Sequence, residues 1–126
     1  MNINVLALAY LGDAIYEIYI REYLIKQNIV KVNLLQKEAI KYVSAKNQAK
    51  FLTEMIESNF LTENEIDIVK RTRNHKSHAS KSTDIITYKY STALEALIGY
   101  LYLEKNTSRI DEIMNFIMRW LNVYIW

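Results

Sequence analysis

The sequence contains no cysteine, no proline and only two glycines. Without cysteine there can be no disulfide and no thiolate metal site, which fits a reducing cytoplasm. Without proline, and with glycine this rare, the chain has few residues that end helices or form tight turns. Long helices are therefore expected, and the positions of the two glycines become informative.

The length and composition are those of one ordinary domain. A chain of 126 residues with 51% apolar residues can bury a real core, so we expect a single domain over residues 1–126. The N-terminus has no basic flank, and the apolar run after it contains Asp13 and Glu17. These features argue against a signal peptide and a membrane span. The net charge of +2 does not by itself demand a nucleic-acid partner.

Apolar residues recur at helical spacing along most of the chain. The expected helices cover residues 6–24, 33–42, 44–57 and 62–73, then a stretch from Asp84 or Tyr88 to about Leu103, and a last one from Ser108 or Asp111 to about Leu121. Asn33 is the expected N-cap of the second helix, and Thr62 with Glu65 forms a capping box. No hairpin or repeat pattern is present. The expected architecture is an all-α bundle of about six helices.

Each glycine stands near an acid in an apolar, helix-patterned stretch. Gly12 precedes Asp13, and Gly99 follows Glu95 by one helical turn. An ionised carboxylate in such surroundings is costly unless a cation, a hydrogen-bond donor or water meets it. Two such acids suggest a shared site for a hard metal ion, and Mg²⁺ suits it because Mg²⁺ takes few carboxylates and keeps several waters. Glu17, one turn after Asp13, can converge on the same point.

Spacing alone also permits a purely structural account of these acids. Glu17 can pair with Arg21 on a solvated face, while Asp13 and Glu95 bond polar groups inside the bundle. The chain would then be a non-catalytic helical module that serves dimerisation or RNA binding. The presence of both acids beside both glycines favours an enzyme, because a structural protein could replace the acids and gain stability.

The segment from Lys70 to Lys81 is rich in lysine and arginine and contains no acid. Hydroxyl and amide side chains are interleaved with the cations, a mixture that suits contacts to phosphate and ribose. A basic loop that is merely solvated is the alternative. The candidate RNA-binding residues are Arg71, Arg73, Asn74, Lys76, Ser77 and Lys81.

Four segments, taken in order, match the motifs of a known family. Residues 8–17 (Leu-Ala-Tyr-Leu-Gly-Asp-Ala-Ile-Tyr-Glu) are similar to the signature helix of ribonuclease III catalytic domains, and residues 93–103 are similar to their second acidic helix. Residues 43–49 resemble the Val-Ser-Ala-x-x-Gln-Ala segment of the compact branch called Mini-ribonuclease III, and residues 71–77 resemble its Arg-Gly-Arg-Asn-Ala-Lys-Ser. The resemblance covers essentially the whole chain.

The resemblance implies a Mg²⁺-dependent endoribonuclease that cleaves double-stranded RNA as a homodimer. Its implied substrate is the precursor of the large-subunit (23S) ribosomal RNA, and its implied location is the cytoplasm, with no membrane partner. Asp13 and Glu95 carry over as the catalytic, metal-binding acids, with Glu17 as a candidate third ligand. The branch lacks a separate double-stranded-RNA-binding domain, and 126 residues leave no room for one.

Three positions depart from the family's patterns. Ala9 and Thr92 stand where full ribonuclease III has further acids, so two ions held by four acids are not supported. Thr72 replaces the usual glycine of the basic motif, which would stiffen or reshape a loop at that point.

The first helix also suggests an interface. Its apolar stretch from Leu6 to Ile20 is too uniform for a helix half exposed to water, which favours a two-fold dimer through this helix. The candidate interface residues are Leu6, Ala9, Tyr10 and Tyr16.

Overall fold

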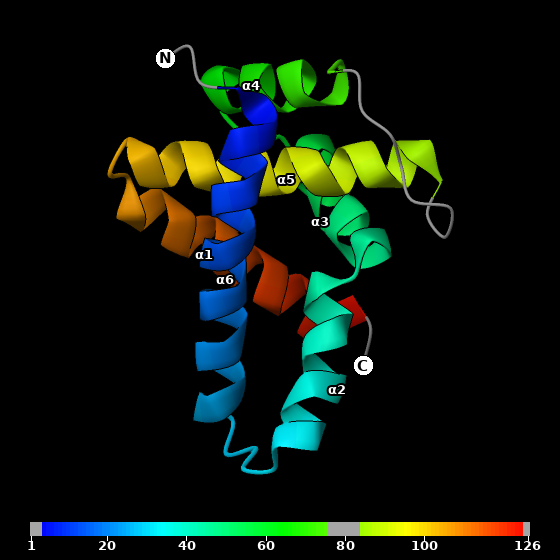
Figure 1. The fold of residues 1–126 in the computed structure, drawn as a ribbon, viewed down its shortest axis with the longest axis vertical. Helices are drawn as coiled ribbons and strands as arrows, with labels where there is room; N and C mark the ends of the chain where they lie inside the picture. Colours follow the sequence, from blue (N-terminus) through cyan, green and yellow to red (C-terminus); the bar gives the residue numbers. More distant parts are fainter. Residues whose placement is uncertain (1–3, 76–83, 125–126) are drawn as a thin grey trace.

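The computed structural model describes residues 4–75 and 84–124, which form six α-helices (Figure 1). The helices are α1 (Val5–Lys26), α2 (Val32–Val43), α3 (Ala45–Glu57), α4 (Glu63–Arg73), α5 (Ile85–Leu103) and α6 (Thr107–Tyr124). These two ranges contain no strand, which confirms the expected all-α class.

Helix α5 is the centre of the bundle. It is crossed by α1, and α3, α4 and α6 also pack against it (Figure 1). A helix that is apolar all round belongs in such a position. In its middle, residues 93, 94 and 96–99 are all buried, an almost continuous run. Helices α1 and α2 contact each other and extend together beyond the other helices (Figure 1).

Side-chain caps explain where most helices begin. Asn4 caps α1, Ser44 caps α3 and Asp84 caps α5. The predicted capping box is confirmed, because Thr62 and Glu65 bond to each other's backbone N–H at the start of α4. The prediction for Asn33 is wrong: α2 begins at Val32 after Lys31, which makes no side-chain cap bond.

Three helices are followed by a residue in the left-handed conformation that is not glycine. Asn28, Asn59 and Lys105 adopt left-handed backbone conformations with φ of 63°, 57° and 59°, just after α1, α3 and α5. Glycine is the usual residue for this conformation, and asparagine is the next most tolerant. Both glycines of the chain are used elsewhere, at the crossing of α1 and α5.

No helix within the described ranges is long and apolar enough to cross a membrane.

Candidate active site

The two glycines allow α1 and α5 to cross at close range. A Cβ atom added to Gly12 would lie 1.7 Å from the backbone oxygen of Glu95, and one added to Gly99 would lie 2.0 Å from the backbone oxygen of Leu8. Backbone atoms cannot turn aside as a side chain can, so any larger residue would force the helices apart. The expectation that missing side chains let another helix approach is confirmed.

This crossing brings Asp13 and Glu95 together. Asp13 follows Gly12 and is exposed, whereas Glu95 is largely sheltered. The two carboxyl groups lie within hydrogen-bonding reach of each other. Burial raises the pKa of Glu95 to about 8, and the hydrogen bond with Asp13 and its negative charge add to the shift. A proton on Glu95 relieves the repulsion between the two carboxylates, and a cation bound between them would relieve it in the same way.

Glu17 lies at the edge of this pair. Its carboxylate accepts a hydrogen bond from Arg21 at 3.3 Å in a partly exposed ion pair, the arrangement that a structural account of Glu17 predicts. Its negative charge makes only the last and smallest contribution to the raised pKa of Glu95. Among the described residues, no three His, Asp or Glu side chains form a group that could hold a metal. Two carboxylates and several waters would therefore have to complete the coordination of an ion.

Gln48 of α3 lies behind Glu95. Its side chain is 2% exposed, and its Oε1 accepts a hydrogen bond from the hydroxyl of Ser91. The amide is close enough to lower the pKa of Glu95, against the larger effect of burial. No sequence signal marked Gln48 as part of the site, apart from its place in the Val-Ser-Ala-x-x-Gln-Ala match.

Tyr16 of α1 completes the buried wall of the site. It is fully buried, and its hydroxyl donates a 2.5 Å hydrogen bond to the backbone oxygen of Tyr42. Burial raises the pKa of Tyr16 well above its usual value, and the charge of Glu95 raises it further. The phenol therefore stays protonated and acts as a fixed donor between α1 and α2.

The basic segment is helical at its start. Arg71 and Arg73 belong to the last turn of α4, and Asn74 is its C-cap. Arg71 and Asn74 are exposed, while Arg73 is partly buried. The Arg73 guanidinium donates to the hydroxyl of Tyr90 at 2.9 Å and lies 5.2 Å from the centre of its ring. The other candidate RNA-binding residues, Lys76, Ser77 and Lys81, lie outside the described residues.

Thr72 stands in this helical turn rather than in a loop. It is buried, and its hydroxyl donates to the backbone oxygen of Ile68 at 2.8 Å. The expected effect of Thr72 on loop shape therefore does not arise, because the residue satisfies its hydroxyl within α4.

The candidate interface residues occupy very different environments. Tyr10 is 85% exposed, and Leu6 is partly exposed. Ala9 and Tyr16 are buried within the protomer, with 6% and 0% of their surface exposed. Helical periodicity turns these two residues toward α5 and the core, so only Leu6 and Tyr10 are available to a second copy.

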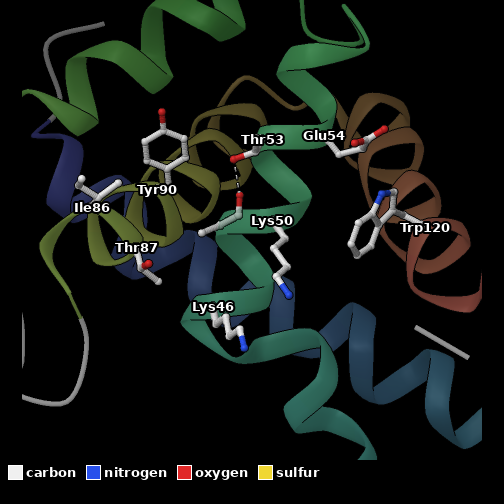
Figure 2. A pocket seen from close by; sticks show the side chains of 9 residues that line it. Lys46, Lys50, Thr53, Glu54, Ile86, Thr87, Tyr90 and Trp120 are labelled. Carbon is white, nitrogen blue, oxygen red and sulfur yellow. Dashed lines mark hydrogen bonds between the residues drawn. The ribbon is translucent and has the colours of Figure 1, made fainter. Parts of the chain in front are cut away.

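The hollow in Figure 2 is separate from the acid pair. It lies between α3, α5 and α6 and has a volume of about 540 Å³. The only acid among its lining residues is Glu54, which lies along α3 with Lys46 and Lys50 and points away from both amines (Figure 2). Without a second carboxylate, this hollow does not offer the chemistry that Asp13 and Glu95 offer.

Comparison with known proteins gives a consistent picture. The ribonuclease III domain family matches residues 6–106 of the chain. Mini-ribonuclease 3 of Enterococcus faecalis is 47% identical over 119 residues, which cover 94% of this chain and 90% of that protein. Mini-ribonuclease 3 of Staphylococcus aureus is 46% identical over 121 residues, which cover 95% of this chain and 90% of that protein.

A solved structure agrees with these sequence matches. The crystal structure of protein FN1578 from Fusobacterium nucleatum has a TM-score of 0.83 and 36% sequence identity, over 94% of this chain and 93% of that one. The resemblance read from the four sequence segments is thereby confirmed along nearly the whole chain. The chain belongs to the Mini-ribonuclease 3 family of ribonuclease III-type endoribonucleases.

Proposed function

We propose that the chain cleaves double-stranded RNA by Mg²⁺-dependent hydrolysis of phosphodiester bonds, with Asp13 and Glu95 as the acids that hold the ion. The observation that carries the proposal is the contact between these two carboxyl groups at the glycine crossing of α1 and α5. Family membership supports the reaction class, and it makes a non-catalytic module the weaker alternative.

The proposed roles of the two acids differ because their environments differ. Mg²⁺ bound at this pair would polarise a phosphate and supply an activated water. Asp13 is exposed, so it holds the side of the site that RNA can reach. Glu95 is sheltered and carries the raised pKa, so it must release its proton before it can act as a ligand. Glu17, already paired with Arg21, is at most an outer support.

The proposed RNA-binding surface is formed by the end of α4 and the segment after it. Arg71, Arg73 and Asn74 would contact the backbone together with Lys76, Ser77 and Lys81. The bond between Arg73 and Tyr90 supports this role, since a guanidinium held in place loses less freedom on binding phosphate. Recognition of A-form RNA depends more on shape and backbone than on base sequence, which suits such contacts.

We also infer a homodimer. A duplex has two strands, and a two-fold dimer would place one Asp13–Glu95 pair on each. The exposed Tyr10 supports an interface along α1, with Leu6 beside it. The interface should bury more than about 1,000 Å², which is typical of specific complexes.

We further infer, from what the resemblance implies, one catalytic domain over residues 1–126 that acts in the cytoplasm on the precursor of 23S ribosomal RNA.

The proposal is tested with an end-labelled RNA duplex incubated with the protein and resolved on a denaturing gel. Cleavage of both strands should require Mg²⁺ and stop with EDTA, while the separated strands and a DNA duplex of the same sequence stay intact. A 23S precursor fragment then tests the natural substrate. Equal cleavage of single strands, or cleavage that persists in EDTA, would contradict the proposal.

A further inference from the structure

One polar group beside the acid pair has no partner. The Nε2 of Gln48 makes no hydrogen bond with acceptable geometry, and the residue is only 2% exposed, so water does not reach this donor. A buried donor without a partner costs about 1–3 kcal/mol. Native proteins keep few such groups, and each calls for a specific explanation.

The orientation of this amide is set by Ser91. The Ser91 hydroxyl donates to Oε1 of Gln48, a contact that joins α5 to α3 across 43 residues of sequence. With Oε1 occupied, the free end of the amide is a donor, Nε2. The bond to Ser91 holds the amide at the interface of α3 and α5.

The amide lies near the Glu95 carboxyl group and the Tyr16 hydroxyl. Ser91 and Glu95 lie one helical turn apart on α5, so their side chains share one face of that helix. Gln48 is close enough to Glu95 to lower its pKa, the effect of a donor on a carboxylate. Glu95 also interacts with Asp13, and Nε2 of Gln48 makes no well-formed hydrogen bond with either neighbour.

We propose that Gln48 is a positioning residue of the metal site: its Nε2 donates to the Glu95 carboxylate when that carboxylate holds Mg²⁺, and so fixes which oxygen faces the ion. This inference rests on the proposed function and deepens it. Groups that orient a metal ligand from behind typically change metal affinity about 10–100-fold when they are removed. The orphaned amide is then a donor kept in place for the metal-bound state.

A purely structural role for Gln48 makes a different prediction. If the Ser91–Gln48 bond only joins α3 to α5, its removal should leave Mg²⁺ binding unchanged. Removing both partners of that bond leaves no buried group unsatisfied, so stability should change little in either case. If Gln48 positions Glu95, metal affinity should fall.

The test is a calorimetric titration of the full chain with Mg²⁺ in the absence of RNA, which measures the Kd. Thermal melting, monitored by circular dichroism, measures the stability of each variant. The variants are Gln48→Leu combined with Ser91→Ala, and Gln48→Met as a volume-conserving second variant. Gln36→Leu, at an exposed glutamine of α2, is the matched control. We expect the Mg²⁺ Kd to rise about 10–100-fold in both Gln48 variants and to stay unchanged in the control. Cleavage of duplex RNA by the variants should recover at raised Mg²⁺.

A wild-type Kd in either folded Gln48 variant overturns this inference and leaves the proposed function standing. A wild-type protein that binds no Mg²⁺ and leaves duplex RNA intact contradicts the proposed function, and this inference with it.

Discussion

Glu95 is the residue whose protonation ties stability to pH. Its pKa rises from 4.5 to about 8 on folding, so between these values the folded protein keeps a proton that the unfolded chain has lost. The stability that Glu95 contributes is therefore fully present below about pH 4.5 and is lost as the pH rises through about 8.

Replacing Glu95 by Gln should remove this dependence, because the amide resembles the protonated acid and cannot titrate. In EDTA at pH 9, Glu95→Gln should be more stable than the wild type by about 2 kcal/mol. Urea unfolding at several pH values measures the difference, and added Mg²⁺ should stabilise only the wild type. Parallel pH curves for the two proteins would show that the pKa of Glu95 is not raised on folding.

Gly99 is the residue on which the crossing depends most directly. Gly99→Ala would place a methyl group 2.0 Å from the Leu8 backbone oxygen, so α1 and α5 must separate. We expect a loss of about 3 kcal/mol in the free energy of unfolding and a loss of cleavage, because the separation also parts Asp13 from Glu95. Ala7→Val, at an exposed position of α1, is the control and should change stability by less than about 0.5 kcal/mol. If Gly99→Ala has the stability and cleavage rate of the wild type, the crossing of α1 and α5 can accommodate a methyl group at this position.

The sequence predicts the acids and glycines of this site better than their surroundings. An acid beside a glycine in an apolar helix is a local pattern, so Asp13 and Glu95 are visible before folding is considered. The place of Gln48 depends on the packing of α3 against α5, which brings it to Ser91 from 43 residues away. The apolar neighbours of Tyr16 permit either a core or an interface position, and the structure buries it within the protomer, where it bonds to Tyr42.

At the scale of helices, one ion pair joins the start of α4 to α6. Arg109 Nε donates to Glu65 at 2.8 Å, and its Nη2 donates to Phe60 and Glu65 at 2.7 and 2.8 Å. Burial would raise the pKa of Glu65, but its hydrogen bonds with Arg109 and Thr62 outweigh it and lower the pKa. Glu65 thus both caps α4 and anchors α6.

Arg109→Leu should cost about 3–5 kcal/mol, because it leaves the buried Glu65 carboxylate without its cation. The double variant Glu65→Gln, Arg109→Leu should recover part of that loss, since glutamine keeps the capping box without a charge. Arg119→Leu, at an exposed arginine of α6, serves as the control. Chemical unfolding gives the three values, and an Arg109→Leu protein as stable as the control would reduce this pair to a surface contact.

Helix boundaries are predictable where a local side chain determines them. Thr62 and Glu65 form their box within four residues, so the pattern alone predicts the start of α4. Helix α2 begins without a side-chain cap, so the prediction that Asn33 is its N-cap was wrong. The end of α4 at Arg73 agrees with the predicted helix over residues 62–73, and Thr72 in its last turn is buried and bonded to Ile68.

At the scale of the whole molecule, a dimer through α1 depends on the exposed Tyr10. Tyr10→Asp should shift the protein to monomer at micromolar concentration, because it places a charge in an apolar interface. Sedimentation equilibrium measures the shift. Tyr102→Asp, at an exposed tyrosine of α5, is the matched control and should remain dimeric. A wild-type protein that is monomeric and still cuts both strands would remove the argument for the dimer.

The most direct test of the account is a single-turnover measurement of duplex RNA cleavage by Asp13→Asn, Glu95→Gln and the double variant, all at saturating Mg²⁺. If the two acids hold one ion, either single change should abolish cleavage as completely as both together, because residues that act as a unit are not additive. The circular dichroism spectra should remain those of the wild type. An Asp13→Asn protein that folds normally and cleaves at the wild-type rate would contradict the shared metal site.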